Sequence, residues 1–262
     1  MIANYHSHTP RCNHAEGSER AYVEQAVAGS LRVLGFSDHT PYFFDGDYRS
    51  RIRMRPEELE DYISVLQNLR EEFRDRIELH IGLEAEYYPK LFPRLVDFLK
   101  QYPIEYLLLG QHALRNEQDG VWTGRPTEDE AVLDQYVGQT LEGLETGCFL
   151  YFAHPDILNF VGDPKVYDRQ YRRLCRRARE LGIPLEYNLL GFSEGKHYPN
   201  PAFWRIAAEE GCRVILGSDA HWPEGVCIPE TEQRGLDILR SCGVTDVMES
   251  LVLPGHFTDR AK

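Results

Sequence analysis

Side chains of the kinds that bind transition metals stand at the ends of predicted strands, or in the loop after the first one. They are seven histidines and two carboxylates: His6, His8, His14, His39, Glu84, His112, His154, Asp219 and His221. Neutral imidazoles and carboxylates are the usual ligands of zinc, manganese and iron. Residues so far apart in the chain meet only if parallel strands bring their carboxyl ends to one place, as in a barrel. The pattern therefore predicts a barrel-like fold and a site for several metal ions.

Strand and helix signals alternate along the whole chain. Short apolar runs bounded by glycine, proline or polar residues predict buried parallel strands. Seven runs are clear: 2–5, 32–37, 78–83, 106–109, 149–153, 184–188 and 213–216. Residues 250–253 are either an eighth strand or part of the closing segment. Without any break in composition, this βα alternation predicts one α/β domain over 1–256 and a short C-terminal tail, 257–262.

Several helices have recognisable sequence signals. Residues 57–75 carry apolar side chains at helical spacing, which predicts an amphipathic helix. Helix starts are indicated at Ser18, at Thr127 by a capping-box pattern, at Asp168, and at Asn200 by the proline that follows it.

Composition restricts the class of protein. No run reaches the roughly 18 apolar residues of a membrane span, and no signal peptide precedes the first predicted strand, so we expect a cytoplasmic protein. The six cysteines show no CxxC spacing and are expected to be reduced. The formal net charge of −13 disfavours a large nucleic-acid-binding surface. The oligomeric state is left open.

The predicted metal site favours an anionic substrate despite the acidic chain. Nine ligands suffice for about three divalent ions, which bring about +6, while the two carboxylates bring about −2. The pocket would therefore carry roughly +4, which favours phosphate esters over neutral substrates.

The ordered metal-ligand segments resemble the polymerase and histidinol phosphatase (PHP) family of metal-dependent phosphoesterases. The resemblance rests on His6-Ser7-His8, His14, Ser37-Asp38-His39, Gly82-Leu83-Glu84, His112, Ala153-His154-Pro155-Asp156 and Gly217-Ser218-Asp219-Ala220-His221. Within the family the chain looks most like the stand-alone histidinol phosphatases, to which Glu186-Tyr187-Asn188-Leu189-Leu190-Gly191 and Tyr198-Pro199 contribute.

The resemblance implies a distorted seven-stranded (β/α) TIM-like barrel with three divalent transition metals: zinc, manganese or iron. Carried over by position, the first metal is held by His6, His8, Glu84 and Asp219. Glu84 bridges to a second metal, completed by His112 and His154. The third is held by His14, His39 and His221. Glu86 is a rival to Glu84 because it lies two residues on and on the same face, and Asp38 and Asp156 are expected to orient histidines.

Two loops are candidates for contacting the substrate. The loop 189–199 follows a predicted strand that supplies no metal ligand, and it offers Lys196 first and His197 second. The loop 40–56 is long enough to form a lid, and Arg51 or Arg53 there suits a phosphate through its planar guanidinium.

The predicted function is hydrolysis of a small phosphate monoester, with L-histidinol phosphate as the specific substrate, in histidine biosynthesis. Asp219 is the expected catalytic proton acceptor, and His221 or a bound water would protonate the leaving group. Three alternatives stay open: a phosphoesterase acting on a nucleotide, a metal hydrolase acting on a carbon centre, and a non-enzymatic metal-binding domain. We expect no nucleic-acid partner and no membrane association.

Overall fold

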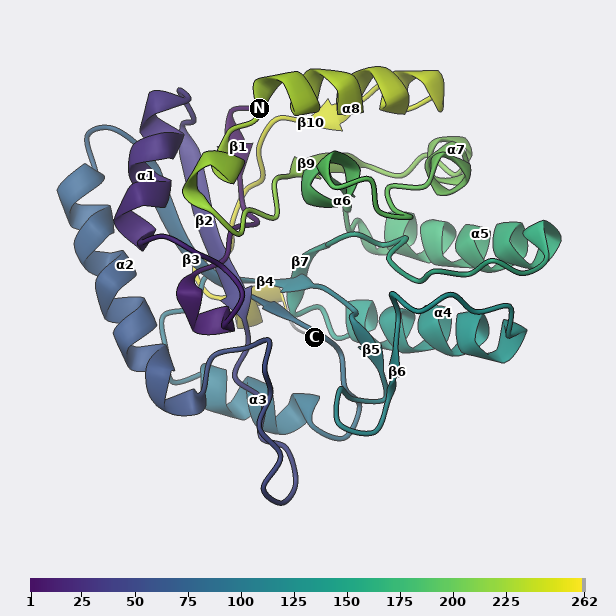
Figure 1. The fold of residues 1–262 in the computed structure, drawn as a ribbon, viewed down its shortest axis with the longest axis horizontal. Helices are drawn as coiled ribbons and strands as arrows, with labels where there is room; N and C mark the ends of the chain where they lie inside the picture. Colours follow the sequence, from purple (N-terminus) through teal and green to yellow (C-terminus); the bar gives the residue numbers. More distant parts are fainter. Residues whose placement is uncertain (261–262) are drawn as a thin grey trace.

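Eight short strands pair in parallel and form one curled sheet in the computed structural model, which describes residues 1–260 (Figure 1). Along the sheet they follow chain order: β1 (Ala3–Asn4), β2 (Val33–His39), β3 (Glu78–Ala85), β4 (Tyr106–Leu109), β7 (Phe149–Phe152), β8 (Leu185–Asn188), β9 (Val214–Gly217) and β10 (Val247–Met248). The α/β class is thus as predicted, but the count of seven strands is wrong. The eighth strand, β10, lies just before the segment 250–253 that we had considered for it.

The curl of the sheet brings the ends of two distant strands together. Beyond β1, the amide nitrogen of His8 donates to the carbonyl of Ala220 at 2.9 Å, and the amide of Ala220 donates to the carbonyl of His6 at 3.3 Å. The segments that follow β1 and β9 therefore meet at the carboxyl end of the sheet, although β10 is the neighbour of β9 inside the sheet.

Helices surround the outer face of the curled sheet (Figure 1). They are α1 (Glu19–Ala28), α2 (Leu59–Phe73), α3 (Phe92–Leu99), α4 (Glu130–Glu145), α5 (Pro164–Leu181), α6 (Leu189–Ser193), α7 (Pro201–Glu209) and α8 (Pro229–Ser241). The stripe predicted for α2 is buried, as expected for an amphipathic helix: Leu59, Tyr62, Ile63, Leu66, Leu69 and Phe73. No helix among residues 1–260 combines the length and the apolar character needed to cross a bilayer.

Helix starts were predicted with mixed success. The side chains of Ser18 and Asn200 accept hydrogen bonds from backbone amides of α1 and α7, as predicted for N-caps. The start at Asp168 is wrong, because Asp163 caps α5. The cap of α4 is Asp129, two residues after the predicted Thr127.

Short elements complete the chain. The turns of 3-10 helix are η1 (Pro10–Cys12), η2 (Pro56–Glu58), η3 (Pro223–Val226) and η4 (Phe257–Arg260). An antiparallel hairpin, β5 (Ala113–Leu114) with β6 (Val121–Trp122), was not predicted. Phe257 is buried and its amide donates to the carbonyl of Ile104, so packed structure continues past the predicted boundary at 256. Residues 261–262 of the predicted tail lie outside the described residues.

Candidate metal centre

Four buried donor atoms meet at the carboxyl end of the sheet. His6 and His8 follow β1, and because they lie two residues apart in extended chain they point to the same side. Their Nε2 atoms each lie 3.4 Å from Oε2 of Glu84, and 3.3 and 3.1 Å from Oδ1 of Asp219. All four side chains are buried. This is the set predicted for the first metal.

Glu84 stands at the middle of the cluster. Its Oε1 lies 2.9 Å from Nε2 of His154 and 3.5 Å from Nε2 of His112, and its Oε2 lies 3.2 Å from Nδ1 of His39. A Cβ atom on Gly110 would fall 1.7 Å from Oε1 of Glu84, so only glycine leaves room for this carboxylate. Glu84, and not its rival Glu86, is therefore the carboxylate that faces several histidines at once.

His14 and His221 face each other at the more open end of the cluster. Their Nε2 atoms are 3.0 Å apart, while each Nδ1 faces a carbonyl oxygen, that of Cys12 at 2.7 Å and that of Asp219 at 2.9 Å. A carbonyl only accepts, so each ring carries a hydrogen on Nδ1, and the neutral ring of His221 presents a lone pair on Nε2. Burial opposes protonation of His14, but its contacts with Cys12 outweigh burial and raise its pKa, so a proton on His14 or a cation bound to both rings must hold the two Nε2 atoms together.

Buried polar atoms without hydrogen-bond partners are a second indication that the donor cluster binds metal ions. Six buried side-chain atoms lack any hydrogen-bond partner: Nε2 of His6, both ring nitrogens of His8, Nδ1 of His39, Oε2 of Glu84 and Nδ1 of His154. Buried polar atoms without partners are rare because each costs about 1–3 kcal/mol. Their concentration in one cluster indicates that a ligand absent from the protein chain satisfies them.

The ionisation states of the carboxylates and histidines in the cluster also favour the binding of cations. Burial opposes ionisation of Glu84 and Asp219, but the surrounding histidines outweigh it and hold both pKa values well below the usual range. Burial lowers the pKa of His39, and lowers that of His221 to about 3, so both rings are neutral. For His6 burial acts in the same direction, but Glu186, Asp219 and Glu84 outweigh it and raise the pKa, so a metal there must displace a proton.

Carboxylates behind the cluster hold two of its rings in place. Nδ1 of His6 lies 2.7 Å from Oε2 of Glu186, and Nδ1 of His112 lies 2.9 Å from Oε1 of Glu86. Such contacts fix the tautomer and leave Nε2 to face a metal. A Cβ atom on Gly217 would meet Oε2 of Glu186 at 2.2 Å, so this strand end also needs glycine.

The two acids predicted to orient histidines differ in position. Oδ1 of Asp38 accepts from the backbone amide of His39 and lies 3.5 Å from Nδ1 of His8, beyond a normal hydrogen bond, so its role in orienting a histidine stays a prediction. Asp156 instead accepts from the amide of Asn200 at 2.5 Å, so the prediction that it orients a histidine is wrong. Burial raises the pKa of Asp156 to about 7.

Two donor residues have strained backbones. His154 has φ of 35° and Asp219 has φ of 52°, in a region that residues other than glycine rarely adopt. Such strain is concentrated at functional sites, where the surrounding structure holds it in place.

The cluster forms the floor of a cavity of about 510 Å³. The residues lining it are His14, Glu16, His39, Ile52, Glu84, His112, Trp122, Leu190, Glu194, Lys196, Tyr198, Asp219, His221 and Trp222. Lys196, the predicted phosphate contact, is thus one of the residues that line the cavity. Its Nζ atom forms an ion pair with Oε2 of Glu194 at 2.9 Å.

The other predicted substrate residues are not among those lining the cavity. Arg53 is buried, and its guanidinium binds Glu86 at 3.0 and 3.1 Å and Glu117 through Nε at 2.9 Å. Its donors are thus engaged, and it supports Glu86 instead of reaching the substrate. Nε2 of His197 faces the carbonyl of Ile157 at 2.7 Å, and Arg51 is exposed in the loop.

Sequence reasoning missed two residues beside the cluster. Glu186 was quoted only as part of a family-like segment, although a glutamate inside a predicted buried strand signals an internal partner. Cys12 was treated only as a reduced cysteine, although it lies between His8 and His14 in the chain. Burial opposes its ionisation, but His14 and His8 outweigh burial and lower the pKa of its thiol.

Residues 4–189 match the model of the PHP domain family. A probable histidinol-phosphatase of Deinococcus radiodurans is 30% identical over 241 residues, which cover 85% of this chain and 87% of that protein. The histidinol-phosphatase of Bacillus subtilis is 24% identical and covers 82% of this chain and 92% of its own length.

One solved structure shares the fold over nearly the full length. It is the histidinol phosphate phosphatase of Lactococcus lactis, crystallised with zinc, L-histidinol and phosphate, and it superposes with a TM-score of 0.75. The identity is 18%, and the match covers 97% of each chain.

Proposed function

This chain belongs to the PHP domain family, and we propose that it is a metal-dependent phosphomonoesterase that converts L-histidinol phosphate to L-histidinol and phosphate. The observation that carries the proposal is a buried cluster of imidazoles and ionised carboxylates at the floor of a 510 Å³ cavity. The names of the relatives from Deinococcus and Bacillus support the choice of substrate.

The cofactors of the proposed enzyme are three divalent transition metals. His6, His8, Glu84 and Asp219 would hold the first, Glu84 with His112 and His154 the second, and His14, His39 and His221 the third. The pairwise distances among these donors and their unpartnered atoms support this division. Zinc in the Lactococcus relative supports zinc for at least part of the centre. We also propose that residues 1–256 form one catalytic unit, against which Phe257 of the short segment 257–262 still packs.

When bound, the metals would stabilise negative charge on the phosphoryl oxygens and make a water acidic enough to attack phosphorus. Asp219 is the proposed acceptor of the proton from that water. Its lowered pKa keeps it ionised, and Nδ2 of Asn188 donates to its Oδ2 at 3.0 Å, which fixes the carboxylate plane. Lys196 would add a positive charge at the cavity wall for a phosphoryl oxygen. His221 was one predicted proton donor to the leaving alkoxide, but its ring is neutral and its Nδ1 hydrogen faces the carbonyl of Asp219, so we propose a water for this role.

The remainder of the cavity suits a small cationic alcohol. Glu16 and Glu194 bring negative charge to its wall, and the indoles of Trp122 and Trp222 offer flat surfaces. L-Histidinol carries an amine and an imidazole, which match acids and aromatic rings. A neutral or anionic leaving group would find no such match with the two glutamates.

The test is a phosphate-release assay of the zinc-loaded protein with L-histidinol phosphate, O-phosphoserine, glycerol phosphate and nucleoside monophosphates. We expect kcat/KM for L-histidinol phosphate to exceed every other value by at least about 10-fold, or ~1.4 kcal/mol. Higher kcat/KM for a nucleotide would reject the substrate, and absence of phosphate release from all of them in the presence of bound metal would reject the enzyme.

A further inference from the structure

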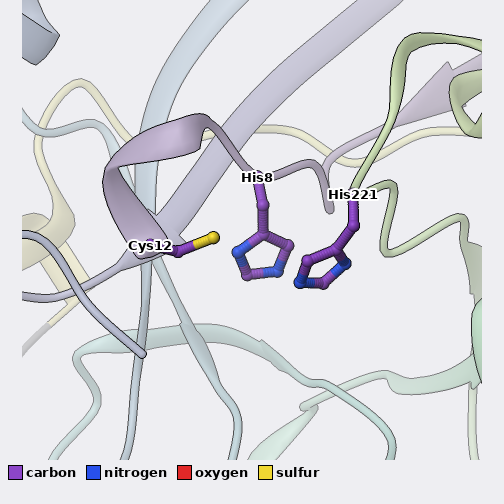
Figure 2. A group of neighbouring side chains, drawn as sticks. All are labelled: His8, Cys12 and His221. Atoms are coloured by element: carbon purple, nitrogen blue, oxygen red, sulfur yellow. The ribbon is translucent and has the colours of Figure 1, made fainter. Parts of the chain in front are cut away.

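Cys12 lies against the metal-donor cluster. The 3-10 turn η1 follows directly after His8 and Thr9 and folds the chain back, so that the sulfur of Cys12 points toward the His8 ring, with His221 on the ring's other side (Figure 2). One donor atom from each of these three residues lies within 4.8 Å of the other two. Cys12 is buried, and so is His8.

His8 supplies an independent reason to expect a ligand at this corner. Both of its ring nitrogens lack hydrogen-bond partners although the side chain is completely enclosed. Its Nε2 faces Glu84 and Asp219, whereas Asp38 lies 3.5 Å from Nδ1, beyond a normal hydrogen bond. The ring is therefore buried between two groups of potential ligands, with a close ion-pair contact to Asp219 but no hydrogen bond at either nitrogen.

We infer that Cys12 is a ligand of the metal centre, adding a sulfur donor beside His8 and His221 at a position that favours zinc over manganese. Donors around a tetrahedral zinc ion lie about 3.5 Å apart, given Zn–S near 2.3 Å and Zn–N near 2.1 Å. Donors within 4.8 Å reach this arrangement with small side-chain movements. Thiolates select zinc over manganese, which prefers oxygen ligands. On binding, a zinc–sulfur bond forms, the S–H bond breaks, and its proton passes to solvent without any change of oxidation state.

The charge at this end of the cluster supports the assignment. His14 and His221 supply imidazole donors, which carry no negative charge, and the carboxylates lie on the buried side around Glu84 and Asp219. A thiolate from Cys12 supplies the negative charge that a divalent ion at the His14–His221 pair otherwise lacks.

Cobalt spectroscopy tests the ligand directly. The metal-free protein is reloaded with Co²⁺, and the near-ultraviolet charge-transfer band of a cobalt–thiolate bond is recorded without substrate. We expect the band in the wild type and in the control variant Cys148→Ser. Cys148 is also buried, but it is not one of the donor residues of the cluster. The band is expected to be absent in Cys12→Ser and Cys12→Ala.

A competition experiment gives the second readout. The ratio of bound zinc to bound manganese should fall at least about 10-fold in Cys12→Ser. Residues that only contact a metal ligand already cost about 10- to 100-fold in metal affinity when they are changed, and a ligand itself should cost no less.

Two outcomes of the cobalt experiment overturn the inference. One is cobalt-loaded wild-type protein without the band, which is decisive whether or not the variants fold, and the other is a band that persists in Cys12→Ser. The inference rests on the metal centre of the proposed function but not on its substrate. Cobalt bound without the band rejects Cys12 alone, whereas failure to bind cobalt rejects the metal centre itself.

Discussion

The two ends of the donor cluster are built differently. At the buried end, His6 and His8 share the oxygens of two ionised carboxylates, Glu84 and Asp219, and Glu186 holds the His6 ring from behind. At the open end, His14 and His221 face each other, and each Nδ1 atom faces a backbone carbonyl. His14 is exposed, whereas His6 is completely buried. The buried end should therefore hold its metal more tightly, and the open end should exchange its metal with solvent.

The largest effect is expected at the carboxylate that joins the two ends. Glu84→Gln removes the charge that faces His6, His8, His39, His112 and His154. We expect loss of more than one metal equivalent and a fall in kcat of about 1,000-fold, or ~4 kcal/mol. Metal analysis and steady-state kinetics check this. Glu78→Gln, at the exposed start of the same strand, is the control. Full metal content with unchanged kcat would remove Glu84 from the centre.

A change at the open end should separate the two regions. His14→Ala removes one of the two facing Nε2 atoms and leaves the buried donors intact. We expect loss of a single metal equivalent and roughly 100-fold lower kcat, about 2.7 kcal/mol. The same variant losing all its metal would mean that the two ends are not independent. Metal retention after dialysis against a weak chelator is the measurement.

A partner behind the buried end should have a smaller effect. Glu186→Gln keeps the shape of the side chain but replaces the charged acceptor beside Nδ1 of His6. Loss of such a partner costs about 10- to 100-fold in metal affinity. Zinc titration of the metal-free protein measures it, with Glu180→Gln on exposed α5 surface as the control. Unchanged affinity would show that His6 needs no support from Glu186.

The smallest effect is expected at the cavity wall. Lys196→Ala should lower kcat/KM for L-histidinol phosphate about 10-fold, or ~1.4 kcal/mol, because its charge is shared with Glu194. Metal content should not change, and inhibition by inorganic phosphate should weaken. Kinetics with phosphate as the inhibitor check both. If phosphate inhibition stays at the wild-type value, the phosphoryl group contacts other residues.

The fold was largely predictable because its signals are local. Short apolar runs separated by amphipathic segments such as α2 define an α/β chain, and strand order follows chain order. β10 escaped prediction because it has two residues, both only partly buried, and its pairing with β9 depends on the curl of the whole sheet. The β5–β6 hairpin was equally short.

The residues of the candidate site divide in the same way: those with a local sequence signal were predicted, and those placed by contacts with distant segments were not. Donors at strand ends, such as Glu84 and His154, were predictable because the carboxyl ends of parallel strands converge. Arg53 was considered for the substrate because its planar guanidinium suits a phosphate and its loop is long enough to form a lid. Its burial depends on Glu86 and Glu117, from two other segments, and no local signal reveals that arrangement. Cys12 likewise depends on the turn η1, which returns its side chain to His8.

The most direct test of the account is a zinc titration of metal-free protein with L-histidinol phosphate hydrolysis followed at each step. The account predicts no turnover without metal, and activity that continues to rise beyond the first bound equivalent and levels off near the third. Full activity at a single reproducible equivalent, or turnover in the metal-free protein, would contradict a catalytic centre built from both ends of the cluster.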